Sequence, residues 1–196
     1  MRIHSIFMTL ARIMAILGGL VLTALILLTV VSVIGRTFNG ILHWEWLETL
    51  APGGTKALLD AGIGPVLGDF ELVEAGIAFT IFAFLPLTQI TGSHATVDVF
   101  TSALPVTANR VLIAFWEVIF AIAMVVIAWR LYDGMLGKMR YNETTFLLQF
   151  PVWWAYAASF GAAAVAAIVT IYTALARMVE LASARAILPD TGEAGH

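Results

Sequence analysis

Cysteine is absent from this 196-residue chain, and charged residues make up only 12% of it. The lack of cysteine excludes disulfide scaffolds, thiol redox chemistry, iron–sulfur clusters and cysteine-ligated zinc. The formal net charge is -3, so the chain has no excess of basic residues to attract nucleic acid. We therefore exclude nucleic acid as a partner.

Familiar catalytic patterns are also missing. The sequence contains no Gly-rich phosphate loop, no Gly-x-Ser-x-Gly turn and no His-Glu-x-x-His pair. Membrane anchors of respiratory enzymes hold haem iron with histidines inside their spans. All the histidines of this chain fall instead in termini or expected loops: His4, His43, His94 and His196. We expect no enzyme activity, no cofactor and no metal site.

Apolar residues are abundant. They make up 61% of the chain, and the mean hydropathy is +0.95, far from the usage of soluble domains. The sequence predicts an all-α integral membrane protein with four transmembrane helices and short interfacial amphipathic helices in its loops. The expected spans are 13–34, 72–90, 111–129 and 152–172, in one membrane domain of residues 1–180 followed by a flexible tail, 181–196.

The first two spans differ in character. Ile13–Ile34 is 22 residues long without a charge, which as a helix would measure about 33 Å and cross a hydrocarbon core. Its length favours an uncleaved anchor over a secretory signal. The second span contains Glu74, Pro86 and Gln89, and these groups need protein partners at membrane depth.

The connections are expected to carry short helices. In the long first loop, 36–71, we predict an interfacial helix over Ile41–Leu50 and a second helix over Lys56–Ala61, capped by Thr55 and stopped by Gly62. The connection 91–110 is also predicted to lie along the interface, because three apolar residues share one helical face: Val97, Phe100 and Leu104.

Small residues recur at helical spacing inside the spans and allow close approach of helices in lipid. They are Ala15, Gly19 and Thr23; Gly76, Thr80 and Ala83; and Ala158, Ala162 and Ala166. Packing within the chain is favoured, and docking of one stripe against another subunit stays open.

Basic residues do not settle the orientation, because five lie on each predicted side of the membrane. Those on the side of the termini are Arg2, Arg12, Arg110, Arg177 and Arg185, and those opposite are Arg36, Lys56, Arg130, Lys138 and Arg140. We favour cytoplasmic termini, since the first helix usually dominates and is preceded by two arginines and a free amine.

Two carboxylates fall within the expected spans. Glu74 follows Asp69 and Glu71 at the start of its helix, where a carboxylate is stabilised by the helix dipole and still reaches water. Glu117 lies about 10 Å from the Arg110 end of its span, so we expect it to be neutral or paired with another helix. A structural role is favoured for both over ion coupling or proton relay.

Two polar segments adjoin the spans. Gly92-Ser93-His94-Ala95-Thr96-Val97-Asp98 follows the second span, and Asn142-Glu143-Thr144-Thr145 leads through Pro151-Val152-Trp153 into the fourth. Taken alone, the first is a turn followed by a capped helix.

At these residues the chain resembles the small permease (DctQ-like) subunit of the tripartite ATP-independent periplasmic (TRAP) transporters of bacteria. The resemblance covers about residues 13–172, and its site residues are Asp69, Glu71, Glu74, Gly92, His94, Asp98, Glu117, Glu143, Thr144, Pro151 and Trp153. The chain departs from the family pattern at Ser93, where glycine is more usual, and by an insertion around 52–67.

The resemblance implies a scaffold subunit in the bacterial inner membrane. It would pair with a large permease that binds sodium and moves the substrate, while a periplasmic binding protein delivers an organic acid. Two other classes stay open: a membrane anchor of a respiratory redox complex, and an autonomous small carrier or channel.

Overall fold

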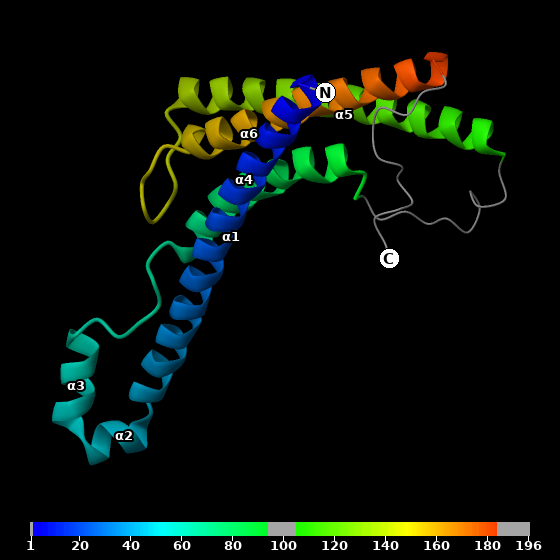
Figure 1. Ribbon diagram of the computed structural model, residues 1–196. Helices are drawn as coiled ribbons and strands as arrows, with labels where there is room; N and C mark the ends of the chain where they lie inside the picture. Colours follow the sequence, from blue (N-terminus) through cyan, green and yellow to red (C-terminus); the bar gives the residue numbers. More distant parts are fainter. Residues whose placement is uncertain (1, 94–104, 184–196) are drawn as a thin grey trace.

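Six helices make up the part of the chain that this computed structural model describes, residues 2–93 and 105–183 (Figure 1). They are α1 (Arg2–Leu42), α2 (Glu45–Leu50), α3 (Pro52–Asp60), α4 (Asp69–Thr91), α5 (Val106–Tyr141) and α6 (Trp153–Ser183). Four of them, α1, α4, α5 and α6, are long and apolar enough to cross a membrane. The predicted all-α protein with four transmembrane helices is therefore confirmed.

The long helices extend well beyond the apolar runs that revealed them. Helix α1 has 41 residues and so measures about 60 Å, twice the thickness of a hydrocarbon core. Helix α5 continues past Trp129 through Arg130 and Lys138, because lysine and arginine are good helix formers outside the membrane as well. Helix α6 runs past residue 180, the expected end of the membrane domain, to Ser183.

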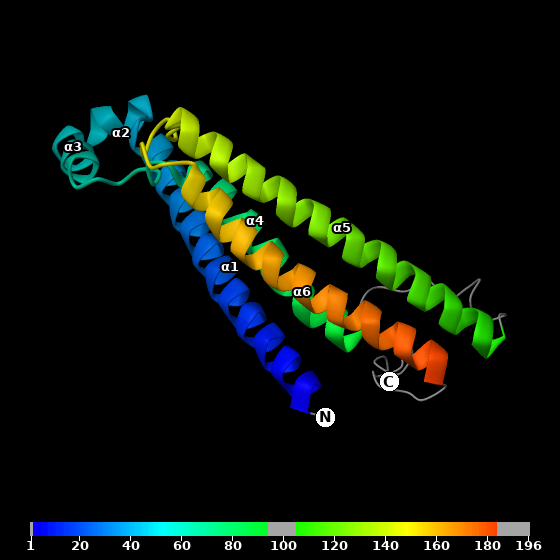
Figure 2. The same cartoon turned by 90° about the horizontal axis from the view of Figure 1, so that it is seen from above.

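The four long helices form an open layer in the order α1, α4, α6, α5. Helix α1 packs on α4, α4 on α6, and α6 on α5. The start of α1 also reaches α6, where the Phe7 ring stacks on the Tyr172 ring with centroids 4.2 Å apart. Within the described residues α1 and α5 make no contact, and Figure 2 shows them at opposite edges of the layer.

Small residues line the seams between these helices. Ala83 of α4 is fully buried, as are Ala163 and Ala166 of α6, which brings the backbones close together. Four of the small residues predicted at helical spacing are buried, as expected if they pack within the chain: Thr80, Ala83, Ala162 and Ala166.

The predicted stripe on α1 is wrong by one residue. A Cβ added to Gly19 would meet nothing within 4 Å, whereas one added to Gly18 would lie 2.9 Å from the Ala83 Cβ. One position along a helix corresponds to a rotation of about 100°. The face of α1 that packs on α4 is therefore the face that contains Gly18.

The short helices differ from prediction at their starts. Helix α1 continues to Leu42, so the interfacial helix is shortened to α2, and α3 begins at Pro52 rather than Lys56. Proline suits a first helical position, because its missing N–H would have no partner there. Thr55 lies inside α3 and donates its hydroxyl to the Ala51 carbonyl at 3.2 Å, so its predicted capping role is wrong. Gly62, with φ +88°, follows the end of α3, as predicted.

The α2–α3 arm, residues 45–60, projects from the C-terminal end of α1, away from α4, α5 and α6 (Figure 1). The predicted amphipathic helix in 91–110 falls largely outside the described residues, and so does most of the predicted tail.

Candidate functional site

The C-terminal parts of α1 and α5 and the N-terminal parts of α4 and α6 share one end of the layer, which we call the Asp69 end (Figures 1 and 2). Asp69 begins α4 and joins it to α1. Its carboxylate accepts a hydrogen bond from the Ser32 hydroxyl at 2.5 Å and pairs with the Arg36 guanidinium at 3.2 Å. Ser32, which is fully buried, also accepts the Val66 backbone N–H at 3.2 Å. Asp69 therefore fixes where α4 starts against α1.

The chain that precedes Asp69 lies along the same face of α1. The Asn39 side-chain amide donates to the Ile63 carbonyl at 3.1 Å. A Cβ on Gly35 would overlap the Gly64 carbonyl, so only glycine allows this close approach. The connection from the α2–α3 arm to α4 is thus held by α1 and does not hang free.

Glu71, two residues into α4, binds the α5–α6 loop, which we define as residues 142–152. Its two carboxylate oxygens accept the backbone N–H groups of Leu147 and Leu148 at 2.7 and 3.0 Å. These are charge-assisted hydrogen bonds between elements 76 and 77 residues apart in sequence. Glu71 thereby joins the start of α4 to the loop before α6.

The α5–α6 loop is closed by its own backbone. The Val152 N–H donates to the Glu143 carbonyl at 3.0 Å, and Thr144 faces Pro151 in an isolated antiparallel bridge. The Glu143 carboxylate pairs with the Lys138 ammonium of α5 at 2.5 Å. Three predicted site residues that are spread over nine positions are therefore brought together: Glu143, Thr144 and Pro151.

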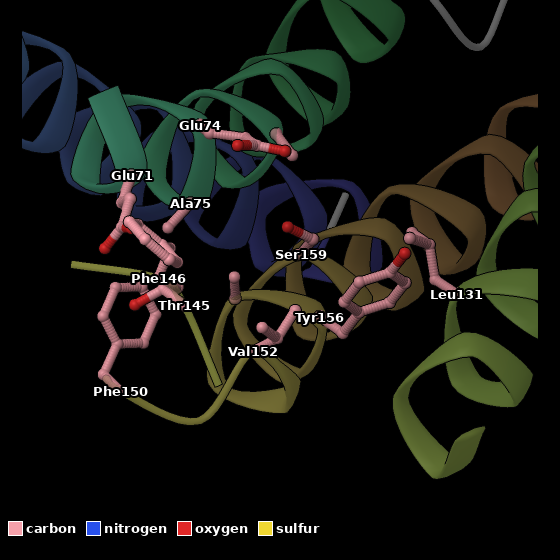
Figure 3. Close-up of a pocket in the computed structure, with 12 residues that line it drawn as sticks. Glu71, Glu74, Ala75, Leu131, Thr145, Phe146, Phe150, Val152, Tyr156 and Ser159 are labelled. Carbon is pink, nitrogen blue, oxygen red and sulfur yellow. The ribbon is translucent and has the colours of Figure 1, made fainter. Parts of the chain in front are cut away.

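A pocket of about 550 Å³ lies between α4, α5, α6 and this loop. Its walls are mostly apolar and include the rings of Phe146, Phe150 and Tyr156. Figure 3 shows Glu74 on the α4 side, with the Ser159 hydroxyl of α6 directed toward α4. Trp153, the remaining predicted residue of this region, begins α6 at the same end.

A second polar cluster joins α4, α5 and α6 away from the Asp69 end. The Gln89 side-chain amide donates to the Glu117 carboxylate, and the Thr173 hydroxyl donates to the same oxygen at 3.1 Å. Gln89 and Thr173 are buried, with 5% and 0% of their surface exposed. Glu117, which we expected to be neutral or paired with another helix, thus accepts hydrogen bonds from two other helices, α4 and α6. Gln89 and Pro86 are buried by protein, as predicted.

Gly92 ends α4 in the left-handed conformation, with φ +66°. The Ser93 N–H then donates to the Thr88 carbonyl at 3.0 Å, which is the arrangement of a glycine-terminated helix. The role that the structure shows for Gly92 is to end helix α4. His94 and Asp98, which complete its motif, lie outside the described residues.

Sequence reasoning missed the partners of Asp69 on α1. Ser32 and Arg36 are four residues apart and so share one helical face. The Ser32 hydroxyl, inside an apolar segment and one helical turn before Arg36, could have indicated a polar contact on this face of α1. Among the described residues, no three His, Asp or Glu side chains come close enough together to hold a metal ion.

Comparison with known proteins identifies the family. The family model described as "Tripartite ATP-independent periplasmic transporters, DctQ component" matches residues 61–180, more than half of the chain. No curated protein and no solved structure matches the chain significantly. The matched region contains α4, α5, the α5–α6 loop and all but the last three residues of α6. The chain is therefore a multi-pass membrane protein and a transporter component, not an enzyme, and it belongs to the DctQ family of TRAP transporters.

Proposed function

We propose that this chain scaffolds the large permease of a TRAP transporter that takes up an organic acid with sodium. The organic acid would be delivered by a periplasmic binding protein. Membership of the DctQ family carries the transporter assignment. Residues 1–180 would act as one membrane domain.

The open layer supports the scaffold role. A closed four-helix bundle surrounds its own core, but here α1 and α5 are the edges of a layer and each packs against one main neighbour. Among the four long helices, α1 is the least buried: 11% of its most apolar 18-residue segment is buried in the structure. Such a layer offers two broad apolar faces, and one can pack against a polytopic partner while the other faces lipid.

The polar residues support the same role. Transporters bind substrate and ions near the bilayer midplane, at broken helices. In this chain Glu117 is engaged by Gln89 and Thr173, and α4, which contains Pro86, continues as one helix to Thr91. These groups join helices of the same subunit, so coupling and substrate binding are assigned to the partner.

We further propose that the chain lies in the bacterial inner membrane with both termini in the cytoplasm. The Asp69 end and the α2–α3 arm would then face the periplasm. Trp44 and Trp46 of the arm region are 55% and 58% exposed, and tryptophan favours the headgroup layer. A single cysteine at Gly192, in this cysteine-free chain, should resist an impermeant thiol reagent in intact cells. Labelling from outside would reverse the orientation.

Reconstitution tests the scaffold role. The tagged chain should co-purify with a much larger membrane protein, and liposomes containing both, with the binding protein, should take up an organic acid when a sodium gradient is applied. Liposomes containing this chain alone should take up nothing. Uptake by the chain alone would indicate an autonomous carrier, and a visible haem absorption band in the purified chain would indicate a redox anchor.

A further inference from the structure

The pocket at the Asp69 end contains a carboxylate without a partner. Glu74 is exposed and has no hydrogen-bond or ion-pair partner among the described residues, unlike Asp69 and Glu71 beside it. A carboxylate in a membrane helix is costly unless a cation or hydrogen-bond donor meets it. The Glu74 carboxylate is therefore free to accept a donor from outside the chain.

A second polar group points into the same space. Ser159 is only 2% exposed and lines the pocket, and its hydroxyl has no hydrogen-bond partner among the described residues. Figure 3 shows this hydroxyl directed from α6 toward the α4 wall that contains Glu74. A buried hydroxyl usually finds a partner. Glu74 and Ser159 together present oxygen acceptors from two helices to one occupant.

The depth of the pocket matches the region of lipid headgroups. Helix α4 has 23 residues and is about 35 Å long, slightly longer than a hydrocarbon core of about 30 Å. Glu74 lies five residues after Asp69, about 7.5 Å from the helix start. Trp153 and Trp154 begin α6 at the same end, and tryptophans mark the interface.

The remaining walls suit a lipid rather than a small ion. They are mostly apolar, and the rings of Phe146 and Tyr156 contribute to them. Aromatic faces attract ammonium groups, and alanine and leucine side chains provide an apolar surface for glycerol and the first acyl carbons. A volume of about 550 Å³ exceeds the space that a single ammonium group needs.

We propose that this pocket binds a phospholipid with a primary ammonium headgroup, of the phosphatidylethanolamine class. The ammonium donates to the Glu74 carboxylate and the Ser159 hydroxyl, and the glycerol region lies against the apolar wall. A primary ammonium offers three donors, which suits acceptors from more than one helix. The assignment goes beyond the transporter role and does not depend on it.

Native mass spectrometry of the purified full chain tests this site. The chain is taken from nanodiscs that contain phosphatidylethanolamine, phosphatidylglycerol and phosphatidylcholine in equal parts. Phosphatidylethanolamine should be retained preferentially. Glu74→Gln should reduce that retention about tenfold, since the charge-assisted contact is lost, and Ser159→Ala should reduce it less. Glu45→Gln, which changes an exposed carboxylate of α2, should leave it unchanged.

Carbodiimide coupling provides a second readout on the unmodified chain. The reagent joins a carboxylate to a primary amine through an amide and is itself converted to a urea. In nanodiscs with phosphatidylethanolamine, the lipid adduct should map to the peptide that contains Glu74. Equal lipid retention by Glu74→Gln and the unmodified chain would overturn the proposal. Coupling of Glu74 to a lysine of a co-purified protein, with no lipid adduct, would also overturn it and would indicate a protein partner.

Discussion

Replacing Gly18 with alanine should separate α1 from α4. The added Cβ would lie 2.9 Å from the Ala83 Cβ and 3.5 Å from the Thr80 carbonyl oxygen. Carbon atoms prefer a separation of about 3.5–4.0 Å, so the two helices must move apart by about 0.6–1.1 Å at this point. Overpacking of this kind costs about 1–3 kcal/mol.

Gly19→Ala is the matched control. Alanine stabilises a helix relative to glycine by up to about 1 kcal/mol, and this gain is common to both variants. A Cβ on Gly19 meets nothing within 4 Å. The difference in unfolding free energy between the two variants therefore isolates the α1–α4 contact, and we expect Gly18→Ala to be less stable by about 1–3 kcal/mol.

This difference is measured by thermal unfolding of the purified variants in the same detergent, with far-ultraviolet circular dichroism as the signal. The Tm of Gly18→Ala should lie below that of Gly19→Ala by about 2–4 °C for each kcal/mol. Adding Ala83→Gly to Gly18→Ala should recover part of the loss, because it removes the opposing Cβ. Equal Tm values for the two single variants would refute the close α1–α4 seam.

Three further predictions concern the polar clusters and the turns. Glu117→Leu should destabilise the purified chain by about 1–3 kcal/mol, because buried donors lose their acceptor. Glu117→Gln should keep both the fold and the sodium-driven uptake of the full assembly. Loss of uptake by a Glu117→Gln assembly that forms normally would assign Glu117 to ion coupling. Glu71→Ala should accelerate hydrogen exchange of the Leu147 amide, and unchanged exchange would remove Glu71 from the loop contact. Gly62→Ala should cost about 1–2 kcal/mol, since φ is positive there; Gly68→Ala should cost more, because its Cβ would also overlap a leucine side chain, and an equal cost would show that the leucine moves freely.

The number and type of spans could be predicted because lipid imposes a simple requirement. An apolar run of about 20 residues is sufficient evidence for a span, and Ile13–Ile34 met it without any knowledge of partners. The ends of the helices were harder to predict from the sequence. The part of α5 beyond Trp129 contains four charged residues, Arg130, Asp133, Lys138 and Arg140, and is still helical. Hydropathy alone does not show that a helix continues past its most apolar segment.

Packing faces and long-range contacts were predicted only in part. The segment 13–34 of α1 contains no charged residue and few polar ones, so the sequence has little periodic contrast to show which face packs on α4, and the choice between Gly18 and Gly19 was undetermined. Ser32 and Asp69 are 37 residues apart in sequence. Their pairing depends on how the connection between α1 and α4 returns to α1, and tertiary contacts such as that of Asn39 set its path.

Three of the four carboxylates of α4 and α5 discussed above join separate elements of this subunit. Asp69 joins α4 to α1, Glu71 joins α4 to the α5–α6 loop, and Glu117 joins α5 to α4 and α6. Each contact fixes one helix against another helix or against a loop, and together they add to the buried apolar clusters that hold the layer. Glu74 differs, since its carboxylate faces a pocket. Of the two carboxylates considered for ion coupling, Glu117 thus has the structural role that the sequence favoured, because it joins three helices, whereas Glu74 is the carboxylate for which we propose an occupant from outside the chain.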